Sequence, residues 1–363
     1  MKLGGFMMPL HPPGHNFTET IAADLEQIVE ADRLGFSEYW IGEHFTAEWE
    51  NIPAPDLLIA QALGRTKNII LGTGVTCLPN HHPFGLAHRI AQLDHMARGR
   101  FYWGVGSGGF PGDLEAFGFD LKSGENRKMT GQTIQAVLDI WNGQEPGTYE
   151  SKYWKYTIPE HVDAVGLRLH LRPYQQPHPP IGVAGVSPSS GTLRLAGERG
   201  WIPMSINIIP PVTLKTHWDA VEEGAEKTGK QPSRADWRIA RTIYVADTTE
   251  QARREAIEGS MGRDFRDYFF RLLPLAGMFD LFKTSSDIPD EDVTLEYLCD
   301  EVWIVGSPDE VERRLRALYD EVGGFGVLLA MAHEWEPADG WKRSLHLLTQ
   351  EVMPRLKDLT PAA

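Results

Sequence analysis

Cysteine is scarce in this sequence, since only Cys77 and Cys299 occur among its 363 residues. Two cysteines so far apart provide neither a disulfide framework nor a zinc ligand set, which fits a reducing cytosol. The amino terminus lacks the apolar core of a signal peptide, and no apolar run approaches the length of a membrane span. We therefore expect a cytoplasmic protein with no membrane segment.

An excess of basic residues is also missing. The chain carries 35 lysines and arginines against 50 aspartates and glutamates, which gives a formal net charge of −15. This charge argues against nucleic acid and against an anionic membrane surface as partners. It says little about a small substrate, because we expect most of these charges on helix exteriors.

Several common catalytic signatures are absent as well. The sequence has no HExxH motif of zinc peptidases and no GxSxG elbow of serine hydrolases. His81 and His82, together with Glu43 and His44, suggest a metal site, but no further ligand pair follows at metal spacing. We therefore predict no metal. No local pattern supports the paired acids of a glycosidase.

What the sequence does contain is a regular alternation of short apolar runs and stretches with helical periodicity. Such alternation predicts a parallel sheet with right-handed crossovers. The predicted strands cover residues 2–8, 38–41, 68–76, 100–105, 181–184, 201–205, 237–246, 302–305 and 326–331. The predicted helices cover residues 57–63, 127–141, 190–199, 212–227, 249–258, 310–319 and 341–352. Two more helices are predicted, one that Thr18 caps and one that runs through Leu86, Ile90 and Leu93.

The number of strands and the chain length favour a single (β/α)8 TIM barrel. A doubly wound open sheet is the alternative. Nothing in the sequence resembles a linker, so we predict one domain over residues 1–363. The rhythm of strands and helices is interrupted at about 107–126, 148–180 and 263–300, where we predict irregular insertions.

His44 is the first candidate for chemistry. It follows the predicted strand 38–41 after Gly42 and Glu43. Polar residues at the carboxyl ends of parallel strands lie where α/β proteins bind their ligands. The alternative is a histidine that caps the end of the strand and has no role in chemistry.

Two glycine-rich segments follow predicted strands. Residues 104–109 (GVGSGG) lack the spacing and the immediate helix of a dinucleotide fingerprint, so they predict only a close approach of a ligand to the backbone. Residues 185–191 (GVSPSSG) open a helix, where hydroxyls and free amides can bind an anion such as phosphate. The alternative is an ordinary serine cap. Arg127 begins another helix and could face the same anion or be a surface arginine.

An unusually apolar and aromatic run extends from Phe265 to Phe282. We predict that it forms an apolar lid over the site. The alternative is a pair of helices buried in a subunit interface.

Several motifs occur in order along nearly the whole chain. They are residues 2–6 (KLGGF), 40–45 (WIGEHF), 71–75 (LGTGV), 82–83 (HP), 93–101 (LDHMARGRF) and 305–311 (VGSPDEV). In this order they resemble the bacterial luciferase-like flavin-dependent monooxygenases. Within that family, residues 8–14 (MPLHPPG) and 51–60 (NIPAPDLLIA) most resemble limonene-monooxygenase-like proteins. The second stretch, together with residues 195–199 (LAGER), also resembles diketocamphane monooxygenases.

The resemblance implies a two-component flavin enzyme. Reduced FMN would arrive from a separate NAD(P)H-dependent flavin reductase and meet O2 as a C4a-peroxide. His44 and His82 fall on two histidines of the family's cleft, and His44 would stabilise or protonate the peroxy group. The Gly74–Val75 bond falls where the family has a non-proline cis peptide behind the flavin ring.

The resemblance also implies a phosphate site. Arg127 matches a phosphate-binding arginine of the family, and the amides of Val186 and Ser187 match its phosphate cradle. Ser189 and Ser190 belong to the same loop. Where luciferase has an arginine this chain has Ser107, so the phosphate must depend more on Arg127 and the serine-rich loop.

We therefore predict an FMN-dependent monooxygenase that acts on a small apolar organic substrate, a terpene or a cyclic ketone. We also expect a homodimer or a higher homo-oligomer. Two alternatives stay open. One is a deazaflavin (F420)-dependent dehydrogenase on the same barrel, and the other is a non-catalytic flavin-binding partner subunit, against which the presence of His44 argues.

Overall fold

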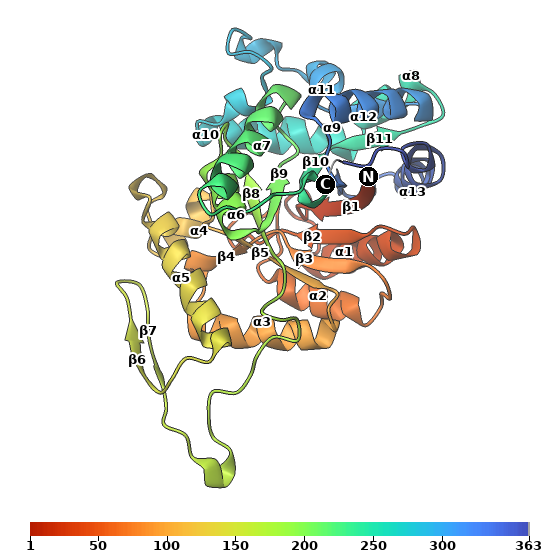
Figure 1. The fold of residues 1–363 in the computed structure, drawn as a ribbon. Helices are drawn as coiled ribbons and strands as arrows, with labels where there is room; N and C mark the ends of the chain where they lie inside the picture. Colours follow the sequence, from red (N-terminus) through yellow and green to blue (C-terminus); the bar gives the residue numbers. More distant parts are fainter. Residues whose placement is uncertain (362–363) are drawn as a thin grey trace.

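Eight parallel strands form a closed barrel in the computed structural model, which describes residues 1–361 (Figure 1). Around the barrel the strands follow one another as β1, β2, β3, β5, β8, β9, β10 and β13. Their bounds are β1 Lys2–Met7, β2 Glu38–Ile41, β3 Ile70–Thr73, β5 Phe101–Gly106, β8 Ile181–Gly185, β9 Ile202–Ser205, β10 Arg238–Arg241 and β13 Val327–Met331. The predicted TIM barrel is confirmed, because β13 pairs with β1 and closes the sheet. The alternative of an open sheet is wrong.

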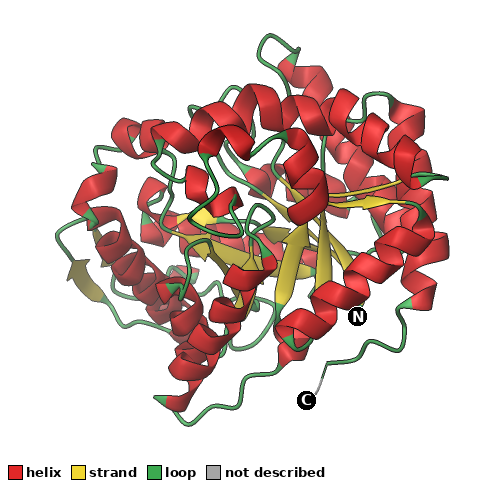
Figure 2. Ribbon diagram, turned by 90° about the horizontal axis from the view of Figure 1, so that it is seen from above, coloured by secondary structure: helices red, strands yellow, loops and turns green. Residues whose placement is uncertain are grey.

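Helices surround the barrel on its outside (Figure 2). The longer ones are α1 Phe17–Arg33, α2 Pro55–Leu63, α3 Pro83–Ala97, α5 Glu125–Asn142, α6 Gly191–Arg199, α7 Pro211–Glu226, α8 Thr249–Glu258, α12 Pro308–Val322 and α13 Ala338–Leu347. Asn16 caps α1 in place of the predicted Thr18, because its side chain accepts hydrogen bonds from the amides of Thr18 and Glu19. Within residues 1–361, none of the helices combines the length and apolar character that a membrane span requires.

Trp40 fills the interior of the barrel, and glycines on neighbouring strands make room for it. A Cβ atom at Gly72 would lie 2.7 Å from the indole ring, and one at Gly182 would lie 2.9 Å from it. Gly104, in the first glycine-rich segment, belongs to the same packing, since a Cβ there would lie 1.9 Å from the carbonyl oxygen of Thr73. Packing inside the barrel therefore accounts for Gly104 without a ligand.

A buried ion pair closes the amino end of the barrel. Glu38 begins β2 and Arg238 begins β10, and both side chains are almost completely buried. Arg238 donates from Nε and Nη2 to the two carboxylate oxygens of Glu38, each over 3.0 Å. The indole Nε1 of Trp40 donates to the same carboxylate over 2.7 Å. The pair thus joins β2 and β10, which are not neighbours in the barrel, through the interior.

Three predicted strands differ from the structure. The predicted strand 237–246 divides into β10 and β11 (Ile243–Val245), and only β10 belongs to the barrel. The predicted strand 302–305 is β12 (Ile304–Gly306), which pairs with β11 in a separate two-stranded sheet. The predicted strand 68–76 divides into β3 and the short β4 (Thr76–Cys77). Strand propensity alone does not reveal where a strand leaves one sheet for another.

The predicted insertions lie where the sequence placed them, but they are more regular than expected. Residues 107–126 include α4 (Pro111–Ala116), and residues 263–300 include short helices, among them α9 (Ser260–Asp264), α10 (Phe270–Leu275) and α11 (Leu295–Glu301). Residues 148–180 contain an antiparallel hairpin of β6 (Gly147–Glu150) and β7 (Lys155–Ile158), which the sequence did not predict. This arm extends away from the barrel (Figure 1). That the chain forms one domain and a homo-oligomer stays a prediction.

Candidate active site

His44 lies at the carboxyl end of the barrel, three residues after β2. Its imidazole is 22 % exposed and lies between two carboxylates. Nδ1 is 3.1 Å from Oδ2 of Asp113, and Nε2 is 3.4 Å from Oε2 of Glu50. Burial lowers the pKa of His44, but the charges of Glu50 and Asp113 outweigh burial and raise it. His44 therefore keeps its proton to a higher pH than a free imidazole does.

Asp113 orients His44 and the loop that carries it. Its Oδ1 accepts hydrogen bonds from the amides of Phe45 and Thr46, over 3.0 and 2.7 Å, and from the Thr46 hydroxyl over 2.7 Å. Its Oδ2 is left for the imidazole. Burial would raise the pKa of Asp113, but the hydrogen bonds from His44 and Thr46 outweigh it and lower the pKa. A negative charge is thus held beside Nδ1 of His44.

Glu50 and Tyr268 form the other side of this arrangement. The Tyr268 hydroxyl donates to Oε1 of the buried Glu50 over 2.7 Å, while Oε2 has no hydrogen-bond partner among residues 1–361. Burial and the charge of Glu50 raise the pKa of Tyr268, so the phenol stays neutral and acts as a donor. Tyr268 lies in a π-helical turn, Phe265–Phe269, and stacks on Trp49 at 5.4 Å between ring centroids.

The aromatic run 265–282 therefore reaches the His44 loop through Tyr268. About half of its large side chains are buried within the chain itself, for example Phe265, whose ring lies 4.8 Å from that of Trp303. Buried side chains cannot form a subunit interface, so the interface alternative does not hold for them. Leu275 is 87 % exposed, and several other side chains of the run are only half-buried, so for these the interface alternative stays open. That the run acts as a lid stays a prediction.

The two histidines after β4 lie in different surroundings. Nε2 of His81 is 3.1 Å from both oxygens of the buried Glu43, the residue before His44. His82 is exposed, and its Nε2 lies 3.1 Å from the carbonyl oxygen of Lys155 on β7. The structure therefore brings His81 against Glu43, whereas it places His82 beside the arm. The sequence named His82 through family resemblance and gave His81 no role.

The peptide bond between Gly74 and Val75 is cis, as the family resemblance predicted. It lies between β3 and β4, and the Gly74 amide donates to the carbonyl oxygen of Ile41 over 2.6 Å. Val75 packs against the side chains that line the barrel interior. Ser107 directly follows β5, and its carbonyl oxygen accepts a hydrogen bond from Asn126 over 2.9 Å.

The serine-rich loop between β8 and α6 is anchored from α7. The Ser189 amide donates to the Thr216 hydroxyl over 2.9 Å, and the carbonyl oxygen of Ser187 lies 3.0 Å from Nε2 of His217. Burial lowers the pKa of His217 to about 4, so the ring is neutral and donates from Nε2. The hydroxyls of Ser190 and Thr192 lie 2.8 Å apart.

These contacts decide which groups of the loop remain available to a ligand. The amide of Ser189 and the hydroxyl of Ser190 already have partners. The amides of Val186 and Ser187 make no hydrogen bond within the described chain. Arg127, in the first turn of α5, is exposed and forms no hydrogen bond or ion pair with the loop. An anion could therefore be held by the two free amides, and that Arg127 supplies the cation stays a prediction.

Sequence reasoning missed Asp113, Glu50 and Tyr268. Asp113 and Tyr268 are 69 and 218 residues from the groups they bind, His44 and Glu50. Asp113 follows Phe-Pro-Gly and has the pattern of a turn, while Tyr268 is one of many aromatic residues in its segment. For Glu50, the only available signal was its position six residues after His44 in the sequence.

Comparisons with known proteins identify the family of the chain. The family model of the luciferase-like monooxygenases matches residues 1–324. The chain is 34 % identical to 3,6-diketocamphane 1,6-monooxygenase of Pseudomonas putida, over 98 % of both chains, and 31 % identical to limonene 1,2-monooxygenase of Rhodococcus erythropolis, over 99 % of this chain and 88 % of the relative.

A solved structure is similar over the whole molecule. It is the oxygenating constituent of the P. putida 3,6-diketocamphane monooxygenase, a type II Baeyer-Villiger monooxygenase, in complex with FMN. The TM-score is 0.92 at 34 % identity, over 100 % of this chain and 99 % of the other. The resemblance inferred from the motifs is confirmed, and the chain belongs to the family of luciferase-like monooxygenases.

Proposed function

We propose that the chain is the oxygenating component of a two-component monooxygenase, which uses reduced FMN and O2 to oxygenate a compact apolar substrate such as a terpene or a cyclic ketone. The observation that carries the proposal is the placement of His44 between Asp113 and Glu50 at the carboxyl end of the barrel. The relatives named above act on diketocamphane and limonene, and one of them binds FMN, which supports this cofactor and substrate class. Because that relative is an oxygenating constituent, we also propose a separate NAD(P)H-dependent flavin reductase as the partner.

The residues present fit a flavin mononucleotide. The free amides of Val186 and Ser187 would bind its phosphate, and the exposed Arg127 would supply the positive charge. Ser107 and the Gly74–Val75 bond lie at the same end of the barrel, where the ring would bind. When bound, reduced FMN supplies the electrons with which O2 is activated.

His44 holds the proton that this chemistry needs. The Asp113 carboxylate accepts from Nδ1–H, so the ring keeps one orientation and the proton that it gains and loses is the one on Nε2. Nε2 is 3.4 Å from Glu50, which is longer than a firm hydrogen bond. A proton on Nε2 can therefore be donated to an oxygen atom that arrives on the open side of the ring.

Apolar side chains around His44 would exclude water. The ring of Phe110 makes an edge contact with the imidazole at 5.3 Å between centroids, and Trp49 stacks on Tyr268. A site with aromatic neighbours of this kind suits a substrate with few polar groups. It would also limit wasteful reactions with water.

A turnover assay tests the proposal. The purified chain would be supplied with FMN, NADH and a generic flavin reductase, together with terpenes and cyclic ketones under 18O2, and products would be read by mass spectrometry. We expect one 18O atom in the product, dependent on both reductase and chain. Hydride transfer with the deazaflavin F420 and no use of O2 would support the dehydrogenase instead. Absence of any flavin-dependent turnover would favour a non-catalytic flavin binder.

A further inference from the structure

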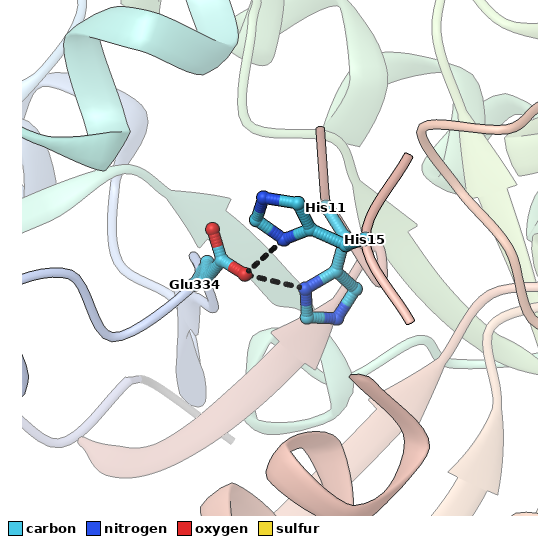
Figure 3. A group of neighbouring side chains, drawn as sticks. All are labelled: His11, His15 and Glu334. Carbon is cyan, nitrogen blue, oxygen red and sulfur yellow. Dashed lines mark hydrogen bonds and ion pairs between the residues drawn. The ribbon is translucent and has the colours of Figure 1, made fainter. Parts of the chain in front are cut away.

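Two histidines and a glutamate converge at the edge of the barrel, outside the site described above. His11 and His15 lie in the loop between β1 and α1, and Glu334 follows β13 (Figure 3). Nδ1 of His11 is 3.1 Å and Nδ1 of His15 is 3.0 Å from the same oxygen, Oε1 of Glu334. The three ligand atoms lie within 4.8 Å of one another. Imidazole nitrogen and carboxylate oxygen are ligands that Zn²⁺ prefers.

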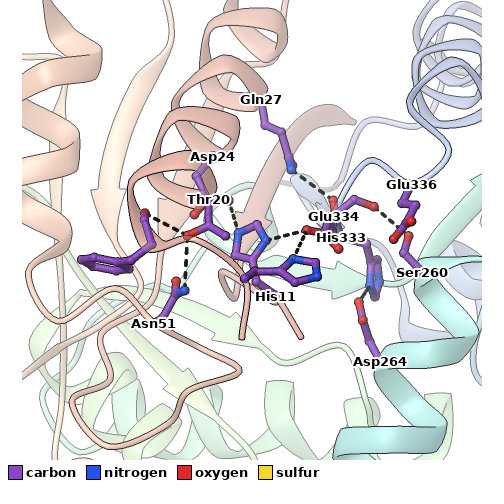
Figure 4. Close-up of polar contacts among 12 residues, drawn as sticks. His11, Thr20, Asp24, Gln27, Asn51, Ser260, Asp264, His333, Glu334 and Glu336 are labelled. Atoms are coloured by element: carbon purple, nitrogen blue, oxygen red, sulfur yellow. Dashed lines mark hydrogen bonds and ion pairs between the residues drawn. The ribbon is translucent and has the colours of Figure 1, made fainter. Parts of the chain in front are cut away.

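The ligands are held in place from behind. The second ring nitrogen of His11, Nε2, lies 3.0 Å from Oδ1 of Asp24, and both side chains are almost fully buried (Figure 4). Arg263 donates from Nη2 to the other oxygen of Glu334, Oε2, over 2.8 Å. Each contact leaves one defined atom, Nδ1 or Oε1, facing the cluster. A carboxylate behind a ligating imidazole is the usual support of a metal-bound histidine.

The arrangement of lone pairs in the cluster also favours a bound cation. When Asp24 accepts the proton on Nε2 of a neutral His11, the lone pair on Nδ1 faces the lone pairs of Glu334 Oε1. A positive centre between these atoms removes the repulsion. Either an additional proton on His11 or a metal ion would satisfy this condition, so the two must be distinguished by experiment.

We propose that His11, His15 and Glu334 bind a divalent cation of the zinc type. A zinc ion with ligands at 2.0–2.2 Å separates tetrahedral ligand atoms by about 3.4 Å. The observed 3.0 and 3.1 Å are a few tenths of an ångström shorter, and His15, whose side chain is 42 % exposed, is free to adjust. Three protein ligands leave a fourth position for water or another ligand.

The open position faces a groove of about 580 Å³ between α1 and the start of α13. His15 and Glu334 line this groove together with Gln27, Trp335 and Lys342. A small anion or a water molecule could therefore complete the coordination from this side. Bound metal would also clamp the loop after β1 to the loop after β13.

The clamp would act on a segment that touches the His44 loop. The His11 amide donates to the carbonyl oxygen of Trp49 over 2.9 Å, directly before Glu50. The cluster itself shares no residue with the His44 arrangement, so its occupancy can be measured without turnover. Binding should therefore be detectable whether or not the proposed monooxygenase function is correct.

Metal titration of the untagged, chelator-treated full-length chain tests the proposal. We expect calorimetry to give one Zn²⁺ per chain, and Co²⁺ as a spectroscopic probe to develop the visible absorption of a tetrahedral site. Zn²⁺ at about one hundred times its dissociation constant should raise the melting temperature by about 3–4 °C. A tag-free chain is required because a histidine tag binds the same ions.

Variants assign the binding to these residues. His15→Ala and Glu334→Gln should each weaken Zn²⁺ binding at least about tenfold, and Asp24→Asn should weaken it by about 10- to 100-fold. His161→Ala, an exposed histidine on the arm, is the matched control and should bind as the parent does. The proposal is overturned when the parent binds no Zn²⁺ at a saturable site, or when His15→Ala and Glu334→Gln bind it unchanged. The cluster would then be an ion-pair network around a protonated His11.

Discussion

The two ends of the barrel differ in how completely their buried charged groups are paired. At the amino end, both oxygens of Glu38 accept hydrogen bonds from Arg238, and Trp40 adds a third. At the carboxyl end, His44 lies between two carboxylates, and Oε2 of Glu50 has no hydrogen-bond partner in the described chain. The carboxylate of Glu38 thus has all its partners at the amino end, whereas Nε2 of His44 and Oε2 of Glu50 have no hydrogen-bond partner among residues 1–361 at the carboxyl end.

The comparison separates stability from chemistry within one scaffold. A buried bidentate pair has one geometry, and removing either partner leaves an uncompensated charge. A proton donor must instead be able to exchange partners, so it cannot be satisfied completely before its ligand arrives. The amino end should therefore govern folding, and the carboxyl end should govern activity, as the division of labour in TIM barrels implies.

The largest expected effect is the loss of His44 at the carboxyl end. Removal of a general acid–base group typically costs about 10²–10⁴ in rate, so His44→Ala should lower product formation by this factor. Binding of reduced FMN should change little, because it depends on phosphate and ring contacts. Oxygen consumption should continue, with hydrogen peroxide released in place of oxygenated product. Product and peroxide would be measured in the same reaction.

His82→Ala is the matched control for this prediction. His82 is exposed and lies against Lys155 on the arm, so we expect product formation near the parental rate. A fully active His44→Ala together with an inactive His82→Ala would move the chemistry to His82. It would also remove the proposed role of the carboxyl end around Asp113 and Glu50.

The amino end should respond to Arg238→Met with a loss of stability. Breaking a buried ion pair from one side typically costs about 3–5 kcal/mol, because the carboxylate of Glu38 stays buried without its partner. Urea unfolding followed by tryptophan fluorescence would measure the free energy of unfolding. The double variant Glu38→Gln, Arg238→Met removes the stranded charge and should recover at least half of the loss. Equal stability of single and double variants would mean that the pair does not govern folding.

The phosphate site should show an intermediate effect. A charge-assisted phosphate contact contributes about 1.5–3 kcal/mol, so Arg127→Ala should weaken FMN binding about tenfold or more. Lys128→Ala, on the same turn of α5, is the control, because Lys128 pairs with Glu125 and should not contribute. Fluorescence titration with FMN measures both dissociation constants. An unchanged constant in Arg127→Ala would leave the phosphate to the amides of Val186 and Ser187.

Much of the barrel could be predicted because a short apolar run in the sequence is enough to indicate each of its strands. The strand 38–41 was predicted to the residue, and most other barrel strands to within one or two residues. The hairpin of the arm was missed, since its exposed strands, apart from Tyr156 and Ile158, lack an apolar run. β12 was placed in the barrel although it pairs with β11, because the partner of a strand is not encoded in the strand itself.

The site was predictable only in part, for a related reason. His44, the cis Gly74–Val75 bond and the serine-rich loop come directly after strands, so strand order or family resemblance located them. Asp113 and Tyr268 come from insertions whose path across the barrel follows from packing. Ser189 looked available to a phosphate, yet its amide already donates to Thr216. Hydrogen bonds between distant segments were thus the missing information.

The smallest expected effect tests how Asp113 acts on His44. Asn at this position keeps the size and can still accept from the amides of Phe45 and Thr46, but it removes the charge beside the imidazole. Because the charges of Glu50 and Asp113 outweigh burial and raise the pKa of His44, Asp113→Asn should lower that pKa. His44 would then lose its proton at lower pH.

The pH profile of turnover is the decisive measurement for Asp113→Asn. The alkaline limb, on which His44 loses its proton, should move to lower pH, and kcat should fall while KM for the apolar substrate stays close to that of the parent. Thr46→Val is the control, because it removes a hydrogen bond to the same carboxylate without changing its charge, so its limb should stay within a few tenths of a unit. A lower kcat without any movement of the limb would contradict an electrostatic role and leave Asp113 as an anchor of residues 45–46. A limb that moves in Asp113→Asn but not in Thr46→Val would show that the incomplete pairing at the carboxyl end sets the protonation of His44.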